Sequence, residues 1–128
     1  MTPFLHIDAR GFSLLDQAMR PGGLTAVFQP LVRLDTLEVI AHEGLSRPAS
    51  GPEGLTVLDL LDLARAKGRL GEFELHAARV VCAAFSAQNG SGRLLVNLSA
   101  QAILHSGLQP NEVIAALAAS GLSFPYHD

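Results

Sequence analysis

The chain has 128 residues, of which 48% are hydrophobic and 16% charged, and its formal net charge is −3. These values are typical of one globular domain with a sizeable core. They exclude a broad basic surface, so we expect no binding to the backbone of DNA or RNA.

The compartment is indicated by three further features. The single cysteine, Cys82, cannot form an internal disulfide, which favours a reducing environment. No apolar run approaches the ~18 residues of a membrane-spanning helix. The first residues include His6, Asp8 and Arg10, which are not typical of a signal peptide. We therefore predict a cytoplasmic protein without a membrane segment.

The first part of the chain predicts a short helix and two strands. Residues 12–20 have apolar side chains at helical spacing and belong to an N-terminal helical lead-in, residues 1–23. Residues 24–34 and 37–45 are rich in β-branched and aromatic residues, as strands are. Pro30 cannot donate a ladder hydrogen bond, so the first of these strands is expected either at a sheet edge or with a break in its ladder.

The second part predicts three helices and one strand. Thr56 and Asp59 have the spacing of a capping box for a helix that ends near Lys67, and Gly68 suits its C-terminal cap. The other elements are a helix over 72–88, a strand over 93–99 that is apolar enough for burial on both faces, and a helix from Pro110 to Gly121. Strands separated by helices favour an α/β fold with a mostly parallel sheet.

Polar residues near the ends of these strands are candidates for a binding site. Glu43 and Asn97 offer a carboxylate and an amide oxygen, which suit a hard cation such as Mg²⁺ or Mn²⁺. Arg47 follows four residues after Glu43, and its planar guanidinium suits a phosphate. Gln29 precedes Pro30 in the first strand. Ligands of α/β sheets bind beyond the carboxyl ends of strands, so the residues alone suggest a metal and phosphate site.

Three ordered motifs resemble the first half of an EAL domain, the cyclic di-GMP phosphodiesterase family. The resemblance covers residues from Leu24 to the end of the chain. The family typically reads Q-P-I-V in its first strand, E-A-L-x-R at the end of the second and V-N-L-S in the third. The matching residues are Gln29-Pro30-Leu31-Val32, Glu43-Gly44-Leu45-Ser46-Arg47 and Val96-Asn97-Leu98-Ser99.

The resemblance implies a fold and a role for each matching residue. It implies that residues 24–128 form part of a modified TIM barrel whose first strand runs antiparallel to the others. Glu43 and Asn97 would be ligands of Mg²⁺ or Mn²⁺, while Gln29, Leu45 and Arg47 would contact cyclic di-GMP. The family's reaction is attack by a metal-activated water on one phosphodiester, which gives linear pGpG.

The chain departs from the family pattern in two ways. Gly44 replaces the alanine of the E-A-L motif. The family's later motifs, which carry its other metal ligands and a lysine, are absent, and a full barrel needs about 250 residues. We therefore expect a truncated barrel with no complete catalytic set and no hydrolysis by these 128 residues. The open sheet edges and apolar face of half a barrel predict self-association, most simply as a dimer.

Other interpretations of these residues and of the whole chain stay open. Glu43 could be a surface acid at a strand end, and Arg47 could only pair with Glu43 or Glu53 at the surface. Asn97 could be a turn residue or a helix cap. His42 is expected to face a covering helix, and Cys82 to be a buried structural thiol. The chain could also be a non-catalytic EAL-like regulatory module, or a protein-interaction module. The gene sequence beyond Asp128 would help to distinguish these possibilities.

Overall fold

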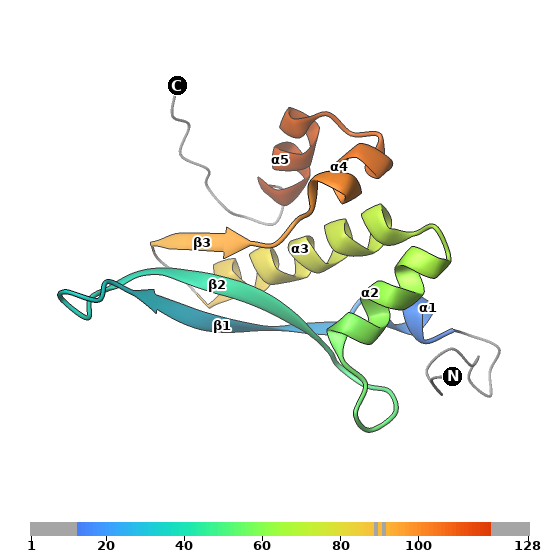
Figure 1. The fold of residues 1–128 in the computed structure, drawn as a ribbon, viewed down its shortest axis with the longest axis horizontal. Coiled ribbons are helices and arrows are strands. Elements are labelled where there is room, and N and C mark those ends of the chain that lie inside the picture. The colour runs from blue at the N-terminus through green and yellow to red at the C-terminus, as the bar shows by residue number, and fades with distance from the viewer. Residues whose placement is uncertain (1–12, 89, 91, 119–128) are drawn as a thin grey trace.

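A computed structural model describes residues 13–88, 90 and 92–118. The elements along the chain are α1 (Leu14–Ala18), β1 (Leu24–Val32), β2 (Val39–Pro48), α2 (Val57–Ala66), α3 (Leu70–Ala87), β3 (Arg93–Val96), α4 (Ala100–Ser106) and α5 (Pro110–Ala118). The described chain is therefore a small α/β protein, as the sequence predicts (Figure 1). The predicted end of the last helix at Gly121 lies outside the described residues.

The three strands form one open mixed sheet in the order β1–β2–β3. β1 pairs antiparallel with β2, and β2 pairs parallel with β3. This confirms the prediction that the first strand runs against the others, and it places β1 with Pro30 at an edge of the sheet. The described residues form no barrel, so the barrel stays a proposal.

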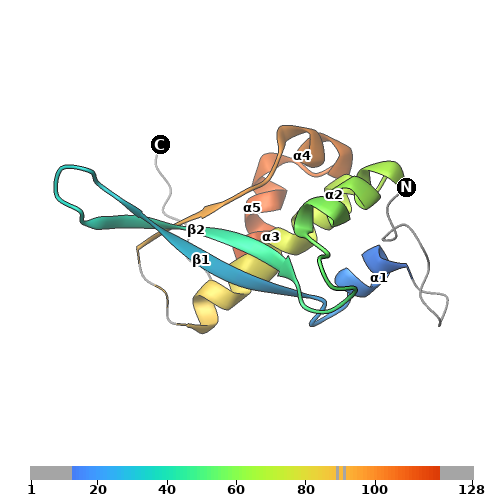
Figure 2. The ribbon, with the colours of Figure 1, turned by 60° about the horizontal axis from the view of Figure 1, so that its bottom comes forward.

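The β1–β2 hairpin extends beyond the helices. Both views show its turn projecting from the body of the molecule, while the opposite end of the hairpin lies beside α1 and α2 (Figures 1 and 2). The register shifts between Leu31 and Val32 near the turn. β2 begins two residues later than predicted and continues to Pro48 rather than ending at residue 45, because its last residues pair with the start of β1.

The helices α2 and α3 begin and end largely where the sequence places them. The Thr56 hydroxyl accepts the Asp59 N–H, and the Asp59 carboxylate accepts the Thr56 N–H, which confirms the capping box. Gly68 has a φ of 68°, the left-handed conformation expected after a helix end. α3 begins at Leu70 rather than at residue 72.

Two apolar clusters hold the layers together. The first joins α1, α2 and the start of α3, with Leu15, Leu60 and Phe73 completely buried at its centre. The second joins the later part of α3 to β3, α4 and α5 around Cys82, which is also completely buried. Burial raises the pKa of the Cys82 thiol, in keeping with a structural role. α3 contributes to both clusters and is the central support of the fold.

The region after α3 differs from the sequence expectation. The predicted strand 93–99 ends at Val96, and Ser99 caps α4, a seven-residue helix that the sequence analysis missed. The prediction that this strand is buried on both faces is wrong, because Leu95 is 50% exposed. Its neighbours Leu94 and Val96 pack against the second cluster, so only one face of β3 is covered.

Among the described residues, no helix has both the length and the apolar character needed to cross a membrane. Cytoplasmic localisation stays a prediction.

Candidate functional site

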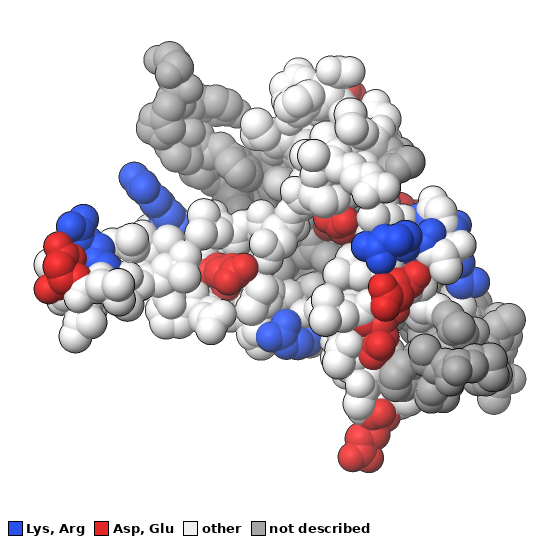
Figure 3. All heavy atoms as spheres, viewed as in Figure 1, with Lys and Arg blue, Asp and Glu red and all other residues white. Residues whose placement is uncertain are grey.

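The five site residues predicted from the motifs gather on one side of the sheet. In β2, Glu43, Leu45 and Arg47 alternate with residues that face α3. Gln29 of β1 is the register partner of Glu43, so both side chains point to the same face. We call this the open face; it carries few charged side chains over the strands (Figure 3).

The opposite face is covered by α3. The rings of Phe28 and His42 lie against the Phe85 ring, with centroids 5.5 and 6.3 Å apart. This confirms that His42 faces a covering helix. Its Nδ1 atom is buried and has no hydrogen-bond partner within the described part of the chain. The open face is thus the side of the sheet that α3 leaves free.

Glu43 and Asn97 meet across the sheet although 54 residues separate them in the sequence. Asn97 follows β3 directly, and its Nδ2 donates a hydrogen bond of 3.1 Å to Glu43 Oε2. The predicted proximity of the two side chains is therefore confirmed. Asn97 follows the carboxyl end of β3, but Glu43 lies in the middle of β2 rather than near its end, because β2 continues to Pro48. The alternative in which Arg47 only pairs with Glu43 finds no support, because no ion pair joins them among the described residues.

Glu74 of α3 holds the segment that carries Asn97. Its two carboxylate oxygens accept hydrogen bonds from the N–H and the hydroxyl of Ser99, at 2.8 and 2.9 Å. The Ser99 hydroxyl also accepts the Ala102 N–H at the start of α4. Sequence reasoning missed Glu74. In the sequence Glu74 is only an acidic residue on a predicted helix. Its partner Ser99 lies 25 residues away, so local spacing does not indicate the contact.

Gly44 is required by the close approach of β2 to α3. A Cβ atom added at Gly44 would overlap the Cγ1 methyl of Val81, and it would lie 3.4 Å from Phe28 and Leu94 side-chain atoms. Its φ is not in the left-handed region, so backbone freedom is not the reason for glycine. Glycine at this position, where the E-A-L motif has alanine, therefore has a packing cause.

Arg47 lies at the end of the open face and is exposed. Its Nη1 donates to the carbonyl oxygen of Ser46 at 2.9 Å. No ion pair of Arg47 with Glu43 or Glu53 is found among the described residues. Its charge is thus not neutralised by an acid in this part of the chain, which suits a residue that binds an anionic ligand.

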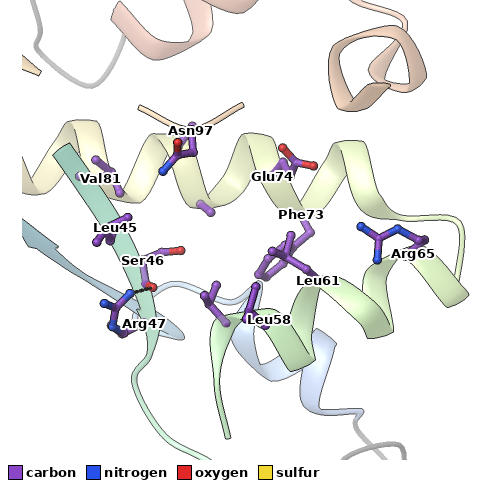
Figure 4. Close-up of a pocket in the computed structure, with 14 residues that line it drawn as sticks. Leu45, Ser46, Arg47, Leu58, Leu61, Arg65, Phe73, Glu74, Val81 and Asn97 are labelled. Carbon is purple, nitrogen blue, oxygen red and sulfur yellow. Dashed lines mark hydrogen bonds between the residues drawn. The ribbon is translucent and has the colours of Figure 1, made fainter. Parts of the chain in front are cut away.

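A cavity of about 340 Å³ lies next to these residues, between β2, α2 and α3. Figure 4 shows Leu45, Ser46 and Arg47 on its β2 side, and Leu58, Leu61 and Phe73 across from them. The lining is mainly apolar, with polar groups from Arg47, Asn97 and Glu74. An apolar cavity beside the guanidinium group of Arg47 fits a ligand that has a flat or apolar part and a negative charge.

Few side chains of the described chain are placed to act as ligands of a metal ion. No group of three or more His, Cys, Asp and Glu side chains is placed there to hold a metal ion. Glu43 and Asn97 supply two oxygen ligands once the Asn97 amide turns its Oδ1 toward the cation. Mg²⁺ commonly uses one or two protein carboxylates, with water and substrate phosphates in the other positions. The pair therefore fits part of a Mg²⁺ or Mn²⁺ site.

The comparisons with known proteins give no family for this chain. No protein-family model matches it, and no curated protein matches it. The EAL resemblance therefore stays an interpretation of the three motifs.

Proposed function

We propose that this chain takes part in cyclic di-GMP signalling, and that residues 24–128 correspond to the first half of an EAL-type phosphodiesterase domain with a truncated modified TIM barrel. In this proposal, Arg47 binds a phosphate of cyclic di-GMP, Gln29 and Leu45 contact the nucleotide, and Glu43 and Asn97 bind Mg²⁺ or Mn²⁺. A divalent ion there would polarise a phosphate oxygen and lower the pKa of a bound water.

The observation that carries the proposal is the meeting of separate motifs on one face. The residues come from three sequence segments, yet Gln29 is the register partner of Glu43 and Asn97 is hydrogen-bonded to Glu43. An antiparallel first strand followed by a parallel pair is also the arrangement that the resemblance implies. Both features support the proposal.

Binding of cyclic di-GMP to the 128-residue chain in the presence of Mg²⁺ tests the proposal. Isothermal titration calorimetry should detect binding that Arg47→Ala weakens at least tenfold, because the charge-assisted phosphate contact is lost. Arg79→Ala is the matched control. Arg79 is an exposed arginine of α3 outside the cavity lining, so its removal should leave the affinity unchanged.

Two results would contradict the proposed site. One is the absence of binding at millimolar nucleotide in a monomeric chain whose circular dichroism shows a folded α/β protein. The other is an equal loss of affinity in Arg47→Ala and Arg79→Ala, which would indicate a general charge effect.

A protein-interaction role is the second candidate function. It is favoured by the exposed apolar side chains at the projecting end of the β1–β2 hairpin, since large exposed apolar patches commonly mark binding surfaces. This role does not depend on nucleotide binding.

A further inference from the structure

The projecting end of the β1–β2 hairpin is unusually apolar. We call residues 32–40 the arm. Five of its nine residues are large hydrophobic side chains with substantial exposure: Val32 42%, Leu34 92%, Leu37 73%, Val39 50% and Ile40 49%. Both ribbon views show that the arm extends beyond α3, so no helix packs on its tip (Figures 1 and 2). A surface of this kind on a single chain is typical of an interface.

Leu37 adds a second unusual feature to the arm. Its φ is 59°, and no other non-glycine residue of the described chain has a positive φ. This left-handed conformation is unfavourable for leucine and is usually occupied by glycine or asparagine. The fold gains little from the leucine side chain, because it is mostly exposed. A gain in an intermolecular contact would account for an apolar residue at this position.

The open face of the sheet is a complementary surface. Val27 and Leu95 are 42% and 50% exposed on it, on either side of β2. The open face carries Arg47 and Arg93 against Glu43, a formal charge of +1. The arm carries Arg33 against Asp35 and Glu38, a formal charge of −1. The two surfaces therefore match in apolar character and are opposite in charge.

The arm and the open face cannot meet within one chain, because the arm is a continuation of the same two strands. A second copy can supply the missing partner for each. If the arm of one copy lies on the open face of the other, a two-fold axis makes the contact reciprocal, and the assembly closes as a dimer. In such a dimer the arm and the open face of each copy are both covered by the partner.

We propose that the chain forms a two-fold dimer in which each arm packs on the partner's open face. The occupant of both surfaces is thus a second copy of this chain. The evidence for the proposal is the exposure, charge and backbone conformation of the arm, not cyclic di-GMP binding. Because Gln29, Glu43 and Leu45 lie on the open face, the partner's arm and the nucleotide would compete for it.

Sedimentation equilibrium of the whole chain, without nucleotide, tests the dimer. The wild type should be a dimer at micromolar concentrations. Leu34→Ser and Leu37→Asn together should raise the dissociation constant at least tenfold. Asparagine is chosen because it tolerates a positive φ, so the hairpin turn is retained. Leu104→Ser is the matched control, since Leu104 is an 81% exposed leucine of α4 outside the arm and the open face.

Disulfide trapping gives a second, geometric test. A Leu37→Cys chain mixed with a Leu95→Cys chain should form an interchain disulfide under a mild oxidant. Leu104→Cys mixed with Leu95→Cys should not. The native Cys82 is completely buried and should not contribute.

The proposal is overturned by a folded monomer at several hundred micromolar. It is equally overturned by a dimer that Leu104→Ser weakens as much as the arm variant does, or by a dimer in which only the Leu104→Cys pair cross-links.

Discussion

At the scale of single residues, Gly44 shows how packing determines one position of the candidate site. β2 crosses α3 so closely that a methyl group at Gly44 would overlap Val81. Val81 is β-branched and buried, so it has little freedom to move aside. Gly44 and Val81 therefore act as a complementary small and large pair, next to Glu43, the proposed metal ligand.

This pair gives a prediction for stability. Gly44→Ala should destabilise the chain by ~1–3 kcal/mol, the usual cost of overpacking. Combined with Val81→Ala, the same substitution should cost much less, because the added methyl then has room. Urea unfolding of the two single variants and the double variant measures the coupling. Additive effects would show that the two positions do not share the space between β2 and α3.

At the scale of elements, the sequence predicts the strands and long helices better than the region around Asn97. β1, β2, α2 and α3 have clear periodicity and end signals, and they form close to the predicted bounds. The apolar run from residue 93 looks like one long strand. The chain instead leaves the sheet after Val96, where Asn97 bonds Glu43 and Ser99 caps α4. These are tertiary contacts and a short capped helix, which periodicity does not detect.

The contact of α3 with Ser99 leads to a second prediction. Glu74→Gln keeps the size of the side chain but weakens the two hydrogen bonds that the carboxylate accepts from Ser99. Residues 97–99 should therefore become more mobile. The side-chain amide signal of Asn97 in a ¹⁵N correlation spectrum should shift or broaden. Glu72→Gln is the control, because Glu72 lies on the same helix and pairs with Arg69 instead. An Asn97 signal that responds equally to both variants would argue against a positioning role for Glu74.

The ion pairs of Arg69 predict a pH dependence for the docking of α1 on α3. Arg69 contacts Asp16 of α1 at 2.8 Å and Glu72 of α3 at 2.9 Å. Hydrogen bonds from Arg69 lower the pKa of both acids below their usual values of 3.8 and 4.5. Lowered acid pKa values stabilise the fold above the unfolded-state pKa, and this contribution is lost as pH falls through the lower folded-state values.

Thermal unfolding between pH 2 and pH 7 should therefore show a loss of stability below about pH 4 that is smaller in Arg69→Met. Methionine keeps an apolar side chain beside Met19 but removes the charge. The effect should be small, because the side chains of Asp16 and Glu72 are 43% and 57% exposed. Parallel pH profiles for the two proteins would mean that other carboxylates control acid unfolding.

At the scale of the whole molecule, the described sheet would provide one side of the proposed binding site rather than an enclosed one. The sheet is open, and the proposed ligand residues lie on a face that α3 does not cover. Hydrolysis of a phosphodiester needs a cation held by several fixed ligands and a water positioned in line with the scissile bond. In the proposal Glu43 and Asn97 would supply two such ligands, and no cluster of three acidic, histidine or cysteine side chains is found in the described chain.

We therefore expect the 128-residue chain to show no hydrolysis of cyclic di-GMP with Mg²⁺ or Mn²⁺, even where the nucleotide binds. Ion-exchange chromatography of the reaction mixture for pGpG is the measurement. If the chain is extended by a segment that supplies the missing ligands and turnover appears, Glu43→Gln should abolish it, because the ligand charge is removed while the shape is kept. Formation of pGpG by the 128-residue chain, at a rate that survives repurification, would show that fewer ligands suffice. Turnover retained in Glu43→Gln would show that Glu43 is not a metal ligand.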